Sequence, residues 1–378
     1  MRTIHREEEL AGVSERTKQA REVRARWAWV EPCVWTERML TALKKGVKGG
    51  VWFSLIDKVY SKRNLLSAFK RVKANRGSAG VDHITVEKFS KRLEDNIERV
   101  HKRLKEGSYY PQKIRRVYIP KPGRKERRPL GIPTVRDRVV QAALRQVIEP
   151  IFELNFSDNS YGFRPGCSCK DALREVDRLL KGGYEYVVDA DIEDYFDSIP
   201  HDRIMEQIGE RIADGRVLRL VESFLKQGVL EGMREWRPEK GTPQGGVISP
   251  LLANLYLDPL DHLMEAKGFM MIRYADDFVV LCSSEKEAHR AMEQIKGWIR
   301  SVGLRLHSDK TRVVDMRKAG FGFDFLGYHF ERTRHSRRIS RWPREKSMQG
   351  LKDKIRGRTR RCNGNSLEQI IDFETDVN

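Results

Sequence analysis

Two adjacent carboxylates, Asp276 and Asp277, stand between two apolar runs in the stretch MMIRYADDFVVLCSS, residues 270–284. The runs are short and rich in β-branched and aromatic residues, so they predict two strands joined by a tight hairpin. Asp is a good turn former, and a solvated turn is one explanation of the pair. The other is a site for a hard divalent cation such as Mg²⁺, which prefers carboxylate oxygens. This second explanation requires another carboxylate at a strand end elsewhere.

A second acidic strand end lies earlier in the chain, in YVVDADIEDYFDSIP, residues 186–200. An apolar strand pattern runs directly into Asp189 and Asp191. Taken alone, these acids are also compatible with helix caps. Two acidic strand ends in one basic chain favour a two-metal site, whose ions lie about 3.5–4 Å apart and stabilise the attacking and leaving oxygens of a displacement. Nucleotidyl transfer, in which a 3′-hydroxyl attacks an α-phosphate and pyrophosphate leaves, is such a displacement.

The composition is strongly basic, with 73 Lys and Arg against 54 Asp and Glu in 378 residues and a net charge of +19. This charge indicates a polyanionic partner, most simply nucleic acid. A membrane surface is the competing interpretation, but we find no apolar run near about 18 residues and no signal-peptide pattern. The few cysteines include no CxxC pair, which argues against a disulfide scaffold and against zinc. We therefore expect a cytoplasmic protein without membrane association, and the oligomeric state stays open.

Helical and strand patterns alternate irregularly along the chain, which predicts an α+β fold rather than repeating βαβ units. Residues 84–107 form an amphipathic helical pattern that ends at Gly107, and residues 135–153 carry a second apolar helical face. Residues 115–134 predict two strands joined by a basic loop. The Gly-rich sequence GTPQGG, residues 241–246, precedes a further helical pattern.

Taken together, these segments resemble a known protein family. Three stretches of the chain resemble, in order, the palm motifs of reverse transcriptases: DADIEDYFDSI, GTPQGGVISPLLANLYLDPLD and RYADDFVVLC. Three further stretches resemble the fingers of bacterial group II intron reverse transcriptases, which are also called maturases. They are RNLLSAFKRVKANRGSAGVD, IPKPGRKERRPLGIPTVRDRVVQAAL and DNSYGFRPGCSCKDAL. The last palm segments resemble SDKTRVVD and FDFLGYHF. The resemblance covers about residues 35–330 and implies right-hand polymerase fingers and a palm whose antiparallel sheet is backed by helices.

The resemblance also implies a division into regions. These are a leader over residues 1–35, fingers with an N-terminal lid over 36–185 with part of the palm interleaved, a palm with the catalytic motifs over 186–330, and a basic linker with the start of a thumb (domain X) over 331–378. The lid resembles GSAGVD, residues 77–82. Relatives continue into a complete thumb and often an HNH endonuclease, so we expect a chain truncated after the palm.

The metal site implied by the resemblance uses the acidic strand ends. Asp191 and Asp276 are expected to be the main ligands of two Mg²⁺ ions, with help from the Ile192 carbonyl. Asp277 is expected to be the supporting third carboxylate. Mn²⁺ suits the same oxygen ligands. Tyr274 is expected to pack near the primer end, although an ordinary strand aromatic explains it equally well.

The nucleotide site implied by the resemblance draws on three further segments. Phe196 matches a gate against the ribose 2′-hydroxyl, because a ring under the sugar leaves no room for the extra oxygen; a core Phe is the alternative. Gln244 is expected to contact the incoming dNTP, and Gly245 lets the backbone approach closely. Lys121 and Arg128 match fingertip cations that hold the triphosphate, with Arg suited to bidentate contacts. Other basic residues in the same loop leave this register open.

Lys310 matches a lysine that protonates the leaving pyrophosphate as a general acid. The implied function is an RNA-directed DNA polymerase that copies an RNA template from a DNA primer with dNTPs, serves intron mobility, and binds intron RNA to assist splicing. The alternative is an RNA-binding maturase remnant with weak or no polymerase activity, because the thumb is incomplete. Phe196 and the YADD turn argue against an RNA-dependent RNA polymerase, and recruitment to phage defence stays open.

Overall fold

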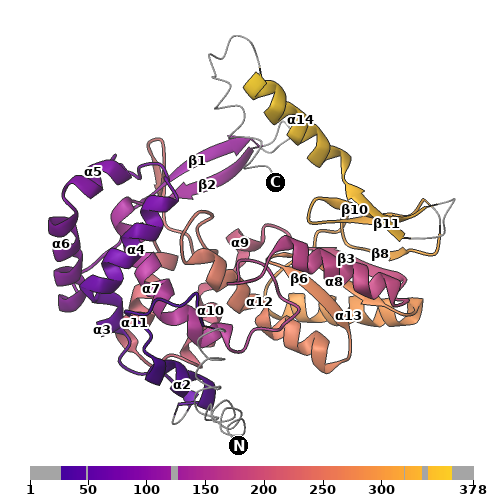
Figure 1. Ribbon diagram of the computed structural model, residues 1–378, viewed down its shortest axis with the longest axis horizontal. Helices are drawn as coiled ribbons and strands as arrows, with labels where there is room; N and C mark the ends of the chain where they lie inside the picture. Colours follow the sequence, from indigo (N-terminus) through magenta and orange to yellow (C-terminus); the bar gives the residue numbers. More distant parts are fainter. Residues whose placement is uncertain (1–26, 48–49, 121–126, 319, 334–338, 360–378) are drawn as a thin grey trace, which may run out of the picture.

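The computed structural model describes most of the chain and combines two lobes (Figure 1). The described residues are 27–47, 50–120, 127–318, 320–333 and 339–359. Helices dominate the first lobe, and a four-stranded sheet with helices on both faces forms the second. One large cluster of buried residues runs through both lobes, so the second lobe is anchored directly on the first.

The first lobe is built around α7 (Val135–Glu153), which is buried along nearly its whole length. The helices that precede it are α2 (Glu37–Lys45), α3 (Ile56–Tyr60), α4 (Lys62–Ala74), α5 (Val86–Lys91) and α6 (Leu93–Glu106). The single helical pattern predicted from residue 84 to Gly107 is therefore two helices. The chain breaks at Arg92, whose N–H donates to the Phe89 carbonyl, and α6 ends at Gly107 in the left-handed conformation that favours glycine.

A hairpin projects from the upper edge of this lobe in Figure 1. Its strands β1 (Ile114–Pro120) and β2 (Arg127–Ile132) pair antiparallel, which confirms the two strands predicted here. Two short strands extend the sheet: β4 (Val229–Glu231) is parallel to β1, and β5 (Arg234–Trp236) is antiparallel to β4. The strand order is β2-β1-β4-β5.

The palm sheet has the order β6-β7-β3-β8, and each neighbouring pair is antiparallel. Its strands are β3 (Tyr186–Asp191), β6 (Met270–Tyr274), β7 (Asp277–Cys282) and β8 (Arg312–Asp315). Because successive residues of a strand face opposite sides, Val188 and Val280 join the large cluster while Val187 and Val279 join a second one. The helices α12 (Ser249–Ala266) and α13 (Glu285–Ser301) cover the first face, and α8 (Cys169–Lys181) covers the second. Burial on both faces explains the continuous apolar runs of these strands.

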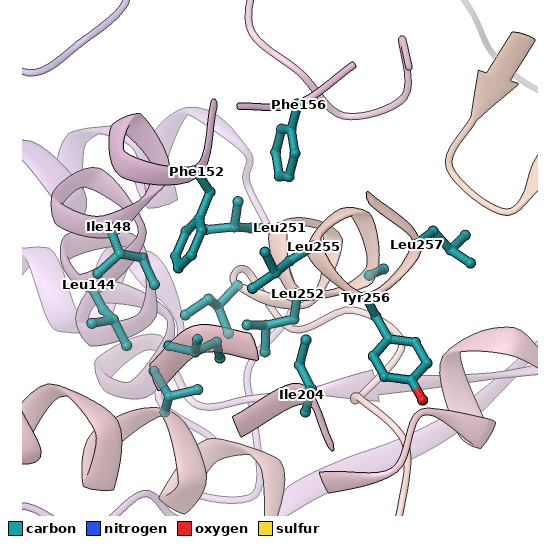
Figure 2. Packing of buried hydrophobic residues seen from close by; sticks show 14 of the residues in the cluster. Leu144, Ile148, Phe152, Phe156, Ile204, Leu251, Leu252, Leu255, Tyr256 and Leu257 are labelled. Atoms are coloured by element: carbon teal, nitrogen blue, oxygen red, sulfur yellow. The ribbon is translucent and has the colours of Figure 1, made fainter. Parts of the chain in front are cut away.

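Helix α12 joins the two lobes. Figure 2 shows Ile148 and Phe152 of α7 beside Leu251 and Leu255 of α12, with Ile204 of α10 (His201–Gly209) in the same cluster. A fully buried apolar side chain of this size contributes about 1.5–3 kcal/mol. This packing fixes the N-terminus of α12, and with it the GTPQGG loop that immediately precedes the helix.

The remaining elements surround this frame. They are α9 (Tyr195–Ser198), α11 (Gly215–Leu225), a three-stranded sheet of β9 (Gly322–Phe325), β10 (Tyr328–Arg332) and β11 (Ile339–Pro343), and α14 (Glu345–Thr359). None of the helices in the described part of the chain is long and apolar enough to cross a membrane.

The leader predicted for residues 1–35 contributes to the core where the structure describes it. Trp27, Val34 and Trp35 are at most 4% exposed and belong to the large cluster. The Trp35 indole N–H donates to the Gln146 carbonyl on α7 at 3.1 Å. The described end of this segment is therefore packed into the hydrophobic core of the first lobe. The boundaries between regions stay predictions.

Candidate active site

Three carboxylates come together at one end of the palm sheet. Asp191, the last residue of β3, lies directly opposite Asp277, the first residue of β7. Asp276 lies in the two-residue turn that follows Tyr274 and closes the β6–β7 hairpin. The predicted strand and hairpin are thus confirmed, with one difference: Asp277 belongs to the strand and only Asp276 of the pair lies in the turn.

Burial and mutual repulsion perturb these carboxylates. Burial raises the pKa of Asp277 to about 7, and the charges of the neighbouring carboxylates add to this rise while the Leu326 N–H opposes it. Burial also raises the pKa of Asp276, and the charge of Asp191 adds to it. Asp189, two residues before the end of β3, has its pKa raised to about 6, mainly by burial. Concentrated like charge of this kind is relieved by a bound cation.

Lys310 is a cation that the structure places against Asp191 in this cluster. Its Nζ donates to Oδ2 of Asp191 at 2.7 Å, and both side chains are partly exposed. The contact arises because residues 191–193 run antiparallel to residues 305–307, with the His307 N–H donating to the Asp191 carbonyl at 2.8 Å. The chain then turns, with the Lys310 N–H donating to the His307 carbonyl, and this turn brings the Lys310 side chain back to Asp191. The structure therefore brings the predicted general acid to a predicted metal ligand.

The donor set at this end of the sheet fits a hard divalent cation. Carboxylate oxygens and the backbone carbonyl of the buried Ile192 are the ligand types that Mg²⁺ and Mn²⁺ prefer. Mg²⁺ typically takes one or two protein carboxylates and completes its coordination with water and substrate phosphates. Within the described ranges, no three His, Cys, Asp or Glu side chains enclose a ready metal position. The assignment of Asp191, Asp276 and Asp277 as metal ligands stays a prediction.

The predicted nucleotide-binding residues of the palm also come together. The Thr242 N–H of the GTPQGG loop donates to the Phe196 carbonyl at 2.6 Å. The Gln244 side-chain amide donates to Oδ2 of Asp197, the residue after Phe196, at 3.1 Å. The Phe196 ring is half-buried and meets the Tyr195 ring edge to face, with centroids 5.7 Å apart. Phe196 and Gln244, the predicted gate and the predicted dNTP contact, are therefore linked by hydrogen bonds between their two segments.

The same loop contacts the fingers hairpin very closely. The Gly131 N–H of β2 donates to the Gln244 carbonyl at 2.6 Å. Gly245 has a φ of 107°, and a Cβ there would lie 2.3 Å from the Gly131 carbonyl oxygen. Only glycine fits this position, as its predicted role requires. Beside it, Gln244, Asp197 and Arg116 help to line a cavity of about 270 Å³ between palm and fingers.

The two predicted fingertip cations are less fully placed. Lys121 lies outside the described residues. Arg128 is exposed on β2, paired in register with Ile119, and lies outside the lining of the cavity between palm and fingers. Their role at the triphosphate stays a prediction.

Three residues that hold the site together escaped the sequence analysis. Asp197 binds Gln244, and the buried His201 ring contacts the Gly241 carbonyl at 2.8 Å, so both position the GTPQGG loop. Arg273 is fully buried beside the turn that carries Asp276. Arg273 could have been found from the sequence, because a charged residue inside an apolar strand must be paired.

The family of the chain follows from comparison with known proteins. Residues 119–330, more than half of the chain, match the family described as reverse transcriptase (RNA-dependent DNA polymerase). The chain therefore belongs to the reverse transcriptase family. Its mixed helices and sheets form the α+β fingers and palm of that family, as predicted.

The relatives point to group II introns. Group II intron-encoded protein LtrA of Lactococcus lactis subsp. cremoris is 42% identical over 196 residues, which cover 51% of this chain and 32% of LtrA. Protein YkfC of Escherichia coli (strain K12) is 33% identical over 311 residues, 71% of this chain and 81% of YkfC. An uncharacterized 91 kDa protein in the cob intron of Schizosaccharomyces pombe is 36% identical over 211 residues, 55% of this chain and 26% of that protein. The matched region is thus about a third of LtrA, and the resemblance to bacterial group II intron reverse transcriptases is confirmed.

Proposed function

We propose that this chain is an RNA-directed DNA polymerase of the group II intron type, which extends a DNA primer on an RNA template. The observation that carries the proposal is the convergence of Asp191, Asp276 and Asp277 at one end of the palm sheet, next to Lys310. Membership of the reverse transcriptase family supports the reaction class, and the names of LtrA and the cob intron protein support the intron setting.

The carboxylate end of the sheet is proposed to perform nucleotidyl transfer. Asp191 and Asp276 would hold two Mg²⁺ ions with the Ile192 carbonyl, and Asp277 would support them. Ions held by these residues would stabilise charge on the attacking 3′ oxygen and on the leaving oxygen. Lys310 lies within hydrogen-bond reach of Asp191 and would donate a proton to the departing pyrophosphate.

The palm loop and the fingers are proposed to bind and select the dNTP. Gln244, held by Asp197, would contact the nucleotide, and Phe196 would lie under the sugar and reject a 2′-hydroxyl. Gly245 would keep the loop against β2. Lys121 and Arg128 would bind the triphosphate as fingertip cations.

The net charge of +19 supports nucleic-acid partners beyond the dNTP. We propose an RNA template, a DNA primer and intron RNA, the last serving intron mobility and splicing. Binding through phosphate contacts should weaken steeply as salt rises.

A primer-extension assay tests the proposal. The protein is given an RNA template, an annealed DNA primer, dNTPs and Mg²⁺, and is compared with Asp276→Asn and with Asp202→Asn, an exposed position on α10. We expect extension with the wild type and with Asp202→Asn, loss of extension with Asp276→Asn, and poor extension when NTPs replace dNTPs. Equal extension by Asp276→Asn would contradict the assignment of the carboxylates.

The alternative function is an RNA-binding maturase remnant with weak or no polymerase activity. The basic composition favours it as much as it favours the polymerase. Salt-sensitive RNA binding by a wild type that extends no primer would select this alternative.

A further inference from the structure

The turn that carries Asp276 is strained. Its first residue, Ala275, has a φ of 60°. Two-residue hairpin turns favour glycine or asparagine where φ is positive, because a Cβ crowds the backbone there. Such a conformation persists only when the surrounding structure holds it, and strained positions of this kind gather at functional sites. The contacts of Ala275 therefore decide whether the neighbouring carboxylate keeps its place.

Arg273 supplies the principal contact. Its Nη1 donates to the Ala275 carbonyl at 2.9 Å, although the side chain is fully buried. The rest of the guanidinium is fixed from the opposite direction by α12. Its Nε donates to Oδ1 of Asp261 at 2.8 Å, its Nη2 donates to Oδ2 of the same carboxylate, and Nη1 also donates to Oδ1 of Asn254 at 3.1 Å. The Asp261 side chain is 3% exposed, so Arg273 and Asp261 form a buried bidentate ion pair.

A second segment closes over the other side of the same turn. The Asn254 amide donates to the Gly162 carbonyl at 2.6 Å. A Cβ at Gly162 would lie 2.2 Å from the Ala275 nitrogen, so the two backbones are in direct contact. The backbone of Arg273 also pairs with residues 159–161 on both its N–H and its carbonyl. The turn is thus held between α12 and the segment 159–162, with Arg273 bonded to both.

Ordinary fold stabilisation does not require this arrangement. Replacing a buried ion pair by apolar residues of similar volume is often neutral or stabilising, because the desolvation of two charges is recovered. The feature that apolar residues could not reproduce is the hydrogen bond to the Ala275 carbonyl. We propose that Arg273, oriented by Asp261, is a positioning residue that holds the Asp276 turn in its catalytic geometry. This inference rests on the polymerase function proposed above.

Three variants separate positioning from stability. Arg273→Met combined with Asp261→Leu removes the ion pair and the bond to Ala275 together. Arg273→Lys keeps a buried cation that reaches the turn but loses the bidentate contact with Asp261. Asp261→Asn keeps a side-chain oxygen that orients Arg273 toward Ala275 and removes only the charge of the ion pair.

For each variant we would measure the melting temperature, kcat and dNTP KM for primer extension, RNA–primer affinity, and hydrogen exchange of the peptide that spans residues 274–277. The double variant should melt no lower than the wild type, yet its kcat should fall about 10²-fold, the loss expected when a reacting group is displaced by about 1 Å. Its dNTP KM and RNA–primer affinity should stay within about twofold, below the tenfold that would correspond to ~1.4 kcal/mol. Exchange in the turn should be faster.

The ranking of the variants by kcat and by melting temperature distinguishes positioning from a purely structural role. Arg273→Lys and Asp261→Asn should melt lower than the double variant but keep more kcat, so activity and stability rank in opposite orders. A purely structural role predicts that kcat follows the melting temperature, and that result would overturn the inference. If the double variant does not fold, Asp261→Asn decides alone: a retained kcat with a lower melting temperature supports positioning, and a kcat that falls in parallel overturns it. A wild type without any extension would instead refute the proposed polymerase function.

Discussion

Replacing Asp277 by Asn should stabilise the metal-free protein above neutral pH while it impairs polymerisation. The ordinary pKa of an Asp carboxyl is 3.8, and burial raises that of Asp277 to about 7. Between these two values the folded protein binds more protons at this site than the unfolded chain does. The free energy of unfolding therefore falls as pH rises through this window, and the cost is complete once the pH exceeds the folded pKa. Asn removes the ionisation and should remove the cost.

The size of the effect follows from the shift. A rise of about three pKa units corresponds to about 4 kcal/mol of destabilisation when the carboxyl is ionised. The side chain is partly exposed, and screening by water reduces the expected gain from Asn to about 2 kcal/mol at alkaline pH. At about pH 5 the wild-type carboxyl is mostly protonated in the folded state, so most of the difference should disappear.

The assay is the melting temperature of the wild type and Asp277→Asn in EDTA, from about pH 5 to pH 8.5, with the exposed Asp202→Asn as the matched control. We expect the wild type and the control to lose stability as pH rises from about 5 to 7 and little further above that, whereas Asp277→Asn loses less. Added Mg²⁺ should raise the melting temperature of the wild type at the alkaline end more than that of Asp277→Asn, because a ligand stabilises the form it binds. Parallel curves for all three proteins over the whole range would refute the reasoning.

Three further changes test the other site residues. Lys310→Met should slow single-nucleotide incorporation about 10²-fold, with little change in melting temperature because its ion pair with Asp191 is partly exposed; a rate within twofold of the wild type would exclude general-acid catalysis by this lysine. Phe196→Ala should lower the preference for dNTP over NTP, measured as the ratio of kcat/KM values, by about tenfold, or ~1.4 kcal/mol; an unchanged ratio would leave Phe196 as a core residue. Gly245→Ala should raise the dNTP KM and destabilise the protein by about 1–3 kcal/mol, whereas Gly297→Ala, whose Cβ would meet nothing on α13, should do neither; equal melting temperatures for the two variants would contradict the close contact with β2.

Local pattern predicted the palm elements well. The apolar runs on either side of Asp276 and Asp277 become β6 and β7, and the run before Asp191 becomes β3, because strands covered on both faces need continuous apolar residues. The hydrophobic pattern of the sequence was less informative where a tertiary contact determines the end of an element. The break at Arg92 divides one amphipathic pattern into two helices.

The site shows the same division between local and long-range information. Asp191 and Asp277 each stand at a strand end, so their proximity could be predicted once the strands were assigned. The contact between Lys310 and Asp191 depends on the pairing of residues 191–193 with residues 305–307, which no local pattern reveals. Resemblance to a family supplied that lysine, whereas Asp197 was overlooked because an exposed acid inside a matched motif carries no local signal of its contact with Gln244.

Arg273 differs from these cases because elementary energetics could have found it. It is the single charge in MMIRY, the strand that leads into the Asp276 turn, and a strand covered on both faces leaves such a charge no access to water. A buried guanidinium must be paired, and an acid on a helix packed against the strand is the natural partner. The preceding helix contains LDPLD, so Asp258 and Asp261 were candidates, and the structure selects Asp261. A cation buried beside the carboxylate cluster is costly to desolvate, and the proposed role of its bond to the Ala275 carbonyl gives a physical reason for its presence there.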